Sequence, residues 1–265
     1  MVLPVNPMNL GRMEKRMALQ QELMAAISHE IRTPVARLSF ALQLLQDILE
    51  GDSVSEQQQQ RMKSSCKGMA QDLEEINDLV AEIMTYIHLE DGGPRIIFQK
   101  VDVNHILTNM CGQYAPQNPQ LSIKVDPLLD GLIIDAEPVQ LRRACQNLLG
   151  NACKYAQAKV SLGYHIEGDF CVLRIEDDGP GIPESDYGHV FAPFTRLDES
   201  RNRKTGGFGL GLSIVRRIAY WHGGRAIAGR SETLGGANMM IRVPVHQPKD
   251  NLPGPAMPDP ADLSV

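Results

Sequence analysis

The chain has 265 residues, 43% of them hydrophobic and 22% charged, which suits an ordinary globular protein of about two domains. Its formal net charge of −6 argues against nucleic acid as the main partner, because domains that bind nucleic acid usually carry a basic face. There is no apolar run of the ~18 residues that a membrane span needs, and we expect no signal peptide in residues 1–7. The five cysteines are scattered without C-x-x-C spacing, which indicates reduced thiols in a cytosolic compartment and no zinc site.

Two segments at the start of the chain have helical periodicity, and the breakers Gly51-Asp52-Ser53 separate them. Because two such helices have an apolar seam but little core, we predict a hairpin that pairs with a second copy to make a four-helix bundle. The alternative is a bundle within one chain, docked on the second domain. The seam positions are Met13, Met17, Met24, Ile27, Ile31, Leu38, Leu42, Leu45 and Leu49 in the first segment and Met62, Cys66, Met69, Leu73, Ile76, Val80, Ile83 and Ile87 in the second.

After the breakers Asp91-Gly92-Gly93-Pro94, strand and helix patterns alternate, which predicts an α/β sandwich. Asp135 is the expected N-cap of the central helix, which accommodates Pro138 in its first turn. The proline-rich tail after Val245 is predicted to be disordered. The expected strands are 95–101, 121–125, 132–134, 159–166, 170–176 and one after each of Gly224 and Gly236, and the expected helices are 103–113, 135–155 and 210–221.

The first helix carries a histidine next to a carboxylate, His29-Glu30. A lone helical histidine is usually a surface or core residue, but Glu30 can orient the imidazole or take its proton, which makes the other ring nitrogen more nucleophilic. Thr33 lies one turn away and can hydrogen-bond a water. Pro34 removes the N–H that would bond the carbonyl of Glu30, so we expect a loosened helix there. Thr33 also excludes a zinc metalloprotease, whose motif requires histidine at that position.

The helix expected over 135–155 presents Asn147 and Asn151 on one face, one turn apart. Asparagine carbonyl oxygens are neutral, hard ligands that suit Mg²⁺ beside nucleotide phosphates. Lys154 can meet a phosphate as a point charge, and Tyr155 can stack on a base. Taken alone, these residues indicate only a polar helix face.

The sequence Asp177-Asp178-Gly179-Pro180-Gly181 follows a predicted strand. A carboxylate at the strand end can accept a hydrogen bond from an exocyclic amine, and the glycines allow the backbone to approach a flat base. A simple tight turn is the alternative, since Asp-Gly is common in turns.

A second glycine-rich segment, Gly207-Phe208-Gly209-Leu210-Gly211-Leu212, opens a helix whose free N–H groups favour phosphate. Neither the context of a dinucleotide fold nor the Gly-Lys-Ser/Thr of a P-loop is present. The loop before it carries an apolar anchor and then basic residues, which is typical of a lid that closes on phosphates, although a solvated charge run would look the same. The anchor is 191–194, and the basic residues are Arg196, Arg201, Arg203 and Lys204.

Together and in order, these segments resemble the catalytic core of a sensor histidine kinase of a two-component system. Residues 28–34 match the family's H box, 147–155 its N box, 177–181 and 207–212 its two glycine boxes, and 191–194 its F box. The resemblance covers residues 10–245, and the run 194–201 is most similar to RstB-type kinases. It implies a linker remnant (1–20), a dimerisation and histidine phosphotransfer domain (21–91), an ATP-binding domain of the Bergerat fold (95–246) and a disordered tail (247–265).

The resemblance also implies a mechanism. His29 takes the γ-phosphoryl group of ATP and passes it to an aspartate of a response regulator, Glu30 activates His29, and Thr33 positions a water that dephosphorylates the regulator. The implied protein is a homodimer that uses ATP and Mg²⁺, as the cytoplasmic portion of an inner-membrane protein. The residues assigned to the nucleotide are Asn147, Asn151, Lys154, Tyr155, Asp177, Gly179, Gly181, Gly207, Gly209, Leu210, Gly211 and Leu212, with Asn151 as the metal ligand and Asp177 as the adenine contact.

Two other functions remain open at this point. An ATPase of the same nucleotide fold explains the glycine boxes but not His29-Glu30 on a helix of the predicted dimer. A dimeric scaffold that binds nucleotide without turnover is disfavoured by the intact Glu30, Asn151 and Asp177. Acid-labile phosphate on His29 distinguishes the kinase from both.

Overall fold

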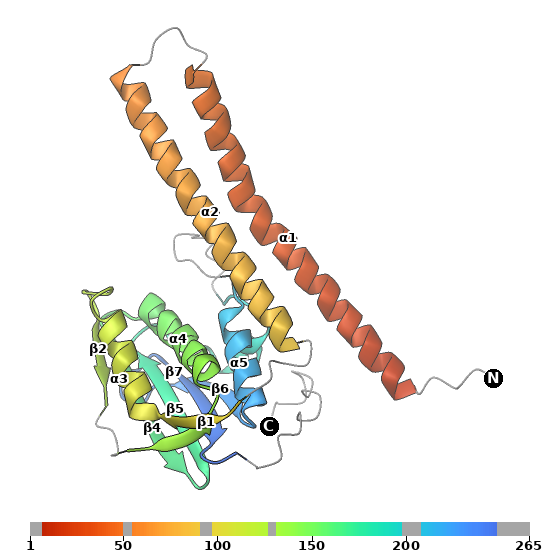
Figure 1. Ribbon diagram of the computed structural model, residues 1–265, viewed down its shortest axis with the longest axis vertical. Coiled ribbons are helices and arrows are strands. Elements are labelled where there is room, and N and C mark those ends of the chain that lie inside the picture. The colour runs from red at the N-terminus through yellow and green to blue at the C-terminus, as the bar shows by residue number, and fades with distance from the viewer. Residues whose placement is uncertain (1–6, 50–54, 91–96, 127–130, 198–207, 248–265) are drawn as a thin grey trace, which may run out of the picture. The chain divides into compact units, whose positions relative to one another are not determined.

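The computed structural model describes residues 7–49, 55–90, 97–126, 131–197 and 208–247, with side chains of the first helix from residue 24 (Figure 1). The predicted site residue Gly207 and almost all of the predicted tail 247–265 lie outside these ranges. The chain divides into two compact units, residues 1–83 and 84–265. No helix among the described residues is long and apolar enough to cross a membrane.

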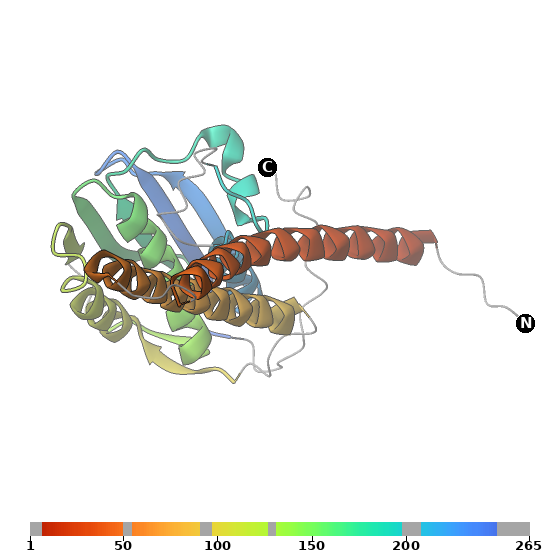
Figure 2. The same cartoon turned by 90° about the horizontal axis from the view of Figure 1, so that it is seen from above.

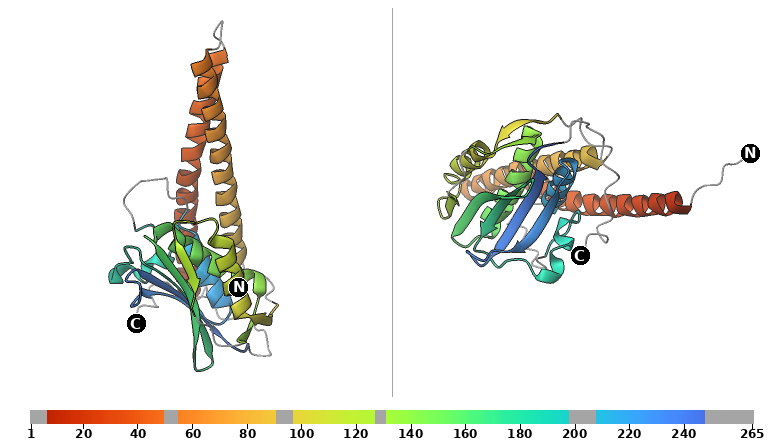
Figure 3. Two further views of the ribbon diagram at one scale, coloured as in Figure 1. Left: turned by 90° about the vertical axis from the view of Figure 1, so that its left-hand side faces the viewer. Right: turned by 90° about the horizontal axis from the view of Figure 1, so that it is seen from below.

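The first unit is the predicted helical hairpin. Helix α1 (Pro7–Leu49) runs through Pro34 without ending, and α2 (Glu56–Glu90) returns beside it, as Figures 1 and 3 show. A capping box starts α2: the Gln58 N–H donates to the Ser55 hydroxyl, and the Gln58 side chain accepts from the Ser55 N–H at 2.8 Å. The last turns of α2, from Met84, belong to the second unit.

The hairpin by itself buries only part of the predicted seam. Positions such as Leu42, Leu49, Leu73 and Val80, which the sequence assigned to the seam of a four-helix bundle, are 46–65% exposed in the single chain. The neighbouring positions Ile48, Asp72 and Leu79 are buried instead. A shift of one residue turns the side chain by about 100°, so the apolar stripe of each helix is wider than one helix–helix contact can cover.

A charged clamp joins α1 to α2. The Arg37 guanidinium donates to the carboxylate of Asp72 at 2.6 Å and also binds Glu75. The hydrogen bond with Asp72 raises the pKa of Arg37, against the opposing effect of burial. Because Asp72 is nearly buried, sliding one helix past the other would leave its charge unpaired, so the clamp fixes the register of the hairpin.

The second unit is the predicted α/β sandwich. Its sheet has the strand order β2-β4-β5-β7-β6, in which only the β2–β4 pair is parallel. Strands β1 (Gln99–Asp102) and β3 (Ile133–Ala136) form a separate antiparallel pair. The five sheet strands are β2 (Ser122–Val125), β4 (Lys159–Glu167), β5 (Phe170–Asp177), β6 (Arg225–Arg230) and β7 (Ala237–Pro244).

Three helices cover one face of this sheet, as Figures 2 and 3 show: α3 (Val103–Tyr114), α4 (Pro138–Tyr155) and α5 (Gly211–Trp221). Their buried apolar residues meet the alternate residues of β4, β5 and β7 that point to this face, and the two sets make the core. Two 3-10 helices that were not predicted, Glu184–Asp186 and His189–Phe191, lie between β5 and α5. The α-helices and strands agree with those predicted from the sequence, with a correction at α4. Its N-cap is Glu137, whose carboxylate accepts from the Gln140 N–H at 2.6 Å.

Asp135 cannot cap α4 because it belongs to strand β3, where it pairs with Lys100 at 2.7 Å. On α4, Cys145 is buried in the apolar core, and burial raises the pKa of this thiol to about 12. Burial raises the pKa of Cys153 to about 11. Both thiols therefore stay protonated at neutral pH, as packing residues do.

A fully buried histidine connects the two helices α5 and α4. The Nδ1–H of His222 donates to the Ile218 carbonyl at 2.8 Å, and Nε2 accepts from the Glu137 N–H at 3.0 Å. The ring also meets Phe98 edge to face, with centroids 5.6 Å apart. Burial lowers the pKa of His222, while its hydrogen bonds and the nearby Glu137 carboxylate oppose that shift. The neutral imidazole is thus the form of His222 that makes both hydrogen bonds.

Acid should weaken this connection. Because the folded pKa of His222 lies below that of the unfolded chain, its stabilisation is present above pH ~6.5 and is lost as the pH falls, by at most about 1.4 kcal/mol per pH unit. We expect the melting temperature of the wild type to drop more between pH 7.5 and 5.5 than that of His222→Gln, measured by circular dichroism. Equal drops would show that His222 is not the titrating group.

Candidate nucleotide and phospho-acceptor sites

In the first unit, His29 is the exposed histidine that the sequence singled out. Its side chain is 72% exposed, and Nδ1 lies 3.2 Å from the Glu30 carboxylate. With Glu30 accepting from Nδ1–H, the neutral ring presents the lone pair of Nε2 to solvent. Thr33 follows one turn later, and Pro34 is buried within the continuous helix. The helix is therefore not broken beside His29.

The asparagines of α4 belong to the second unit. Asn147 donates its side-chain N–H to the Gly211 carbonyl at 3.2 Å, which ties α4 to the first residue of α5. Asn151 is half-buried one turn later on the same face. At the end of α4, the Lys154 ammonium lies 4.8 Å from the ring centre of Tyr155, which is itself 40% exposed. The predicted polar helix face is thus present.

The second glycine box forms a bend into α5. Gly209 has φ +77°, and a side chain there would come within 2.9 Å of the backbone of Phe194. The Gly209 carbonyl accepts from the Phe194 N–H at 2.9 Å, so the F box and the glycine box are one connected structure. Leu210 is buried, and Leu212 lies in the first turn of α5. The bend leaves the first N–H groups of α5 free of helical partners, the arrangement that favours an anion.

Asp177 is a buried carboxylate at the end of β5. Its Oδ1 accepts from the N–H groups of Gly179 at 2.9 Å and Ala237 at 3.2 Å. Burial raises the pKa of Asp177, and these two hydrogen bonds oppose the shift. A carboxylate oriented by backbone N–H groups in this way can use its second oxygen to accept from a ligand amine.

The next residue, Asp178, has a different task that the sequence did not reveal. Its carboxylate accepts from the N–H groups of Gln157 at 2.8 Å and Ala158 at 3.0 Å, where the chain leaves α4 for β4. Burial alone would raise the pKa of Asp178, but backbone hydrogen bonds outweigh it and hold the pKa below its usual range. Asp178 therefore anchors a loop, while Asp177 faces the glycines.

The positions around Asp177 require glycine because a larger residue would not fit there. A side chain at Gly179 would overlap the Tyr155 carbonyl, so the first glycine box lies directly against the end of α4. Gly181 has φ +78° and packs on Gly236, which donates its N–H to the Asp177 carbonyl at 3.1 Å. Gly236 was predicted only as a strand boundary; the nearby Gly235-Gly236 pair was the one signal for its role.

The second unit thus brings two groups of predicted site residues together: Asn147 with Gly209 and Gly211, and Asp177 with Gly179 and Tyr155. Both groups involve α4, one along its face and the other at its C-terminal end. His29, Glu30 and Thr33 lie in the other unit. The second unit is thus an α/β sandwich with two glycine-rich bends against α4, and it follows a helical hairpin with an exposed histidine.

Comparison with known proteins assigns both parts. Residues 19–92 match the family described as His Kinase A (phospho-acceptor) domain. Residues 136–247 match the Histidine kinase-, DNA gyrase B-, and HSP90-like ATPase family. With both domains in this order, the chain belongs to the sensor histidine kinases and carries their phospho-acceptor and ATPase domains.

Named relatives support the same family assignment. The chain is 31% identical over 228 residues to the sensor protein RstB of Escherichia coli K12, covering 86% of this chain and 49% of RstB. It is 30% identical over 241 residues to the sensor histidine kinase CpxA of the same strain, covering 89% and 49%. The chain thus spans about half the length of the curated relatives it matches. In fold it is similar to histidine kinase ThkA, solved in complex with response regulator protein TrrA (TM-score 0.64, 19% identity, 88% and 64% covered).

Proposed function

We propose that this chain autophosphorylates on His29 at the expense of ATP and passes the phosphoryl group to an aspartate of a response regulator. The observation that carries the proposal is the exposed His29 ring with Nδ1 against Glu30, on a chain that also has the ATPase domain. The relatives RstB and CpxA are named as sensor proteins, which supports the same class of reaction. The proposal includes an inner-membrane location for the natural protein, with this region in the cytoplasm.

The chemistry follows from the ring's geometry. Nε2 attacks the γ-phosphorus of ATP, a P–N bond forms, and the bond from that phosphorus to the β-phosphate oxygen breaks as ADP leaves. The imidazole becomes positively charged, and Glu30 accepts or shares the Nδ1 proton at 3.2 Å. For dephosphorylation of the regulator, Thr33 would hold the water that hydrolyses the phosphorylated aspartate, because Thr33 lies one turn from His29 on α1.

The nucleotide site is proposed around the two glycine boxes. Asp177 would accept from the exocyclic amine of adenine, while Gly209, Gly211 and the start of α5 would receive the phosphates. Asn151 suits Mg²⁺ because its amide oxygen is a neutral ligand, so that the phosphates supply the negative charge that balances the ion. When bound, the ion would neutralise charge on those phosphates; the chain's own part is to hold the base and the phosphate chain in place.

Replacing His29 tests the proposal directly. With γ-labelled ATP and Mg²⁺, the wild type should gain acid-labile, base-stable label, and His29→Gln should gain none because no nucleophilic nitrogen remains. The matched control is His88→Gln, another exposed helical histidine, which should label like the wild type. Glu30→Gln should label about 10²-fold more slowly, since a general base contributes on that order.

Two results would contradict the kinase. Unlabelled protein that still binds ATP would indicate a nucleotide-binding scaffold. Release of free phosphate without label on the protein would indicate an ATPase.

The hairpin also carries a surface suited to a second copy of the chain. Apolar residues recur every seven positions on α1 at Val35, Leu42 and Leu49 and on α2 at Leu73 and Val80, and all are 44–65% exposed. A repeat of seven is the spacing of helices that pack side by side in a bundle. These side chains lie beside the hairpin's own contact, where a third and a fourth helix would cover them. We therefore propose a homodimer through a four-helix bundle.

A charge on that surface should separate the subunits. We expect light scattering to give a dimeric mass for the wild type and a monomeric mass for Leu42→Asp combined with Leu73→Asp, because the buried carboxylates would face apolar partners. Phe40→Asp is the control: Phe40 is 73% exposed but lies on the opposite side of α1, so the dimer should persist. A dimer that survives the double change would rule out this surface.

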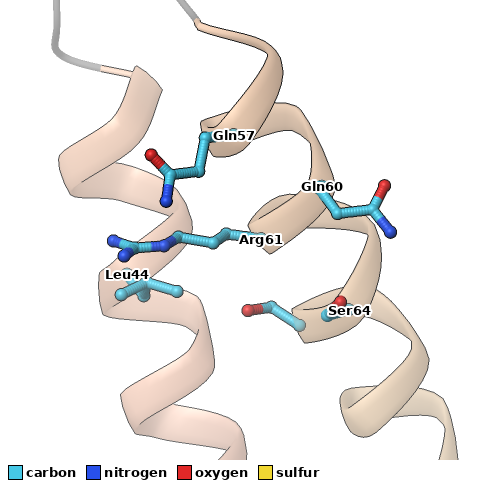
Figure 4. A pocket seen from close by; sticks show the side chains of 6 residues that line it. Leu44, Gln57, Gln60, Arg61 and Ser64 are labelled. Atoms are coloured by element: carbon cyan, nitrogen blue, oxygen red, sulfur yellow. The ribbon is translucent and has the colours of Figure 1, made fainter.

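The opposite side of the hairpin suits the regulator. Phe40 follows His29 by eleven residues, which places it on the same face about 16 Å along α1, and Leu44 continues that face. Beside Leu44 a groove opens between the helices, and Figure 4 shows the Arg61 side chain reaching across it from α2. The other residues that line the groove are Gln57, Gln60, Ser64 and Ser65.

An exposed aromatic anchor beside a polar, cationic groove is a common form of docking surface. We propose that the receiver domain of the regulator binds here, within reach of His29. The solved complex of ThkA with TrrA, a kinase of the same fold with its regulator, supports the choice of partner.

Phosphotransfer should depend on Phe40. Purified receiver domains of the source organism would be screened with labelled wild type, and the fastest acceptor taken as the regulator. Phe40→Asp should autophosphorylate normally but transfer to that acceptor at least about tenfold more slowly, since a central aromatic anchor is commonly worth more than 1.4 kcal/mol. Val139→Asp, an equally exposed apolar position on α4, should transfer normally. Unchanged transfer by Phe40→Asp would place the docking surface elsewhere.

A further inference from the structure

The turn between β6 and β7, residues 231–236, closes over Asp177. It delivers the Gly236 N–H to the Asp177 carbonyl at 3.1 Å and the Ala237 N–H to the Asp177 carboxylate at 3.2 Å. The turn has little freedom at Gly236, where any side chain would overlap Asp177. Its position therefore decides how the carboxylate of Asp177 is aimed.

A second carboxylate holds the same turn from the other face of the sheet. Glu176 and Asp177 are consecutive residues of β5, so their side chains point to opposite faces. The hydroxyl of Ser231, at the start of the turn, donates to Glu176 Oε1 at 2.8 Å. The same hydroxyl accepts the Leu234 N–H at 2.9 Å, and the Gly235 N–H bonds the Ser231 carbonyl at 3.0 Å. Ser231 thus organises the turn as well as fastening it.

Both members of this contact are buried. Ser231 is 1% exposed and Glu176 is 5% exposed. The second oxygen of Glu176 lies 3.4 Å from Arg174 Nε, and Arg174 in turn binds Asp126 at 2.6 Å. An ion pair with Arg174 thus orients Glu176 at its other oxygen, which suits it as the point of attachment for the turn. Thr233 Oγ1 reaches Glu176 only at 3.5 Å, too far to replace the Ser231 hydroxyl.

We infer that the hydrogen bond from Ser231 to Glu176 is a latch that aims the Asp177 carboxylate and thereby sets how strongly the site prefers adenine. The inference rests on the proposed role of Asp177 as the acceptor for the exocyclic amine. Ser231 and Glu176 are positioning residues, since they act on the base only through the turn and Asp177.

The amine gives a readout that a general loss of stability would not imitate. ATP and purine riboside 5′-triphosphate differ in the 6-amino group, which only the former carries. Calorimetric titration of the full chain with each nucleotide in Mg²⁺ gives the preference for the amine as a ratio of dissociation constants. We expect Ser231→Ala to lower this ratio about fivefold by weakening ATP alone, the scale of one hydrogen bond. Binding of the purine analogue should stay unchanged.

Changes at Glu176 and a matched serine keep the test independent of folding. Glu176→Gln retains an oxygen that accepts from Ser231 and should keep the preference, whereas Glu176→Ala should lose it like Ser231→Ala. Ser39→Ala is the control, because Ser39 also donates its hydroxyl within the chain, to the Val35 carbonyl at 2.9 Å, but lies on α1 in the other unit. It should bind both nucleotides as the wild type does.

Asp177→Asn separates failure of this inference from failure of the proposed site. If the wild type shows no preference for ATP, or Asp177→Asn leaves it intact, then Asp177 does not read the amine and both proposals fall. If Asp177→Asn removes the preference but Ser231→Ala leaves it intact, or weakens both nucleotides equally, the latch is overturned and the site stands.

Discussion

The carboxylate of Asp177 is the constraint around which the second unit is arranged. A buried carboxylate must receive hydrogen bonds, and here backbone N–H groups of Gly179 and Ala237 supply them. Backbone donors can approach this closely only where neighbouring side chains are absent, which explains the glycines at 179 and 236. The end of β5, the exit from α4 and the β6–β7 turn therefore meet at one carboxylate.

The first unit has the opposite character, because its core is left unfinished. Two helices bury Ile48 and Leu79 and fix their register with Arg37 and Asp72, yet regularly spaced apolar side chains stay in solvent. A surface of this kind gains free energy when another helical pair covers it. The exposed His29 occurs in the same unit. An accessible histidine and an incomplete core are compatible because they use different sides of α1.

The sequence predicted most elements correctly, since breakers and periodicity are local signals. Gly168, Gly224 and Gly236 marked turns that the strands of the sheet indeed follow. Errors arose where the decisive contact was not local. Asp135 has the side chain of an N-cap residue, but it lies in strand β3, which pairs with β1, and its carboxylate forms a salt bridge with Lys100. Glu137 caps α4 instead. Periodicity likewise revealed the apolar stripe of each helix, but not which part of it meets the other helix of the hairpin.

For the candidate site, too, the local features could be predicted from the sequence and the long-range contacts could not. The sequence by itself determined which residues could act at His29, Asn151 and Asp177, their order along the chain and the glycine-rich segments among them, because each of these motifs is only a few residues long. Only the tertiary structure decided that Asp177 and Asp178 have different tasks, and that Ser231 and Glu176 clasp the turn over the former. Those hydrogen bonds join residues 21 and 55 positions apart along the chain, and bonds at such separations leave no local pattern in a sequence.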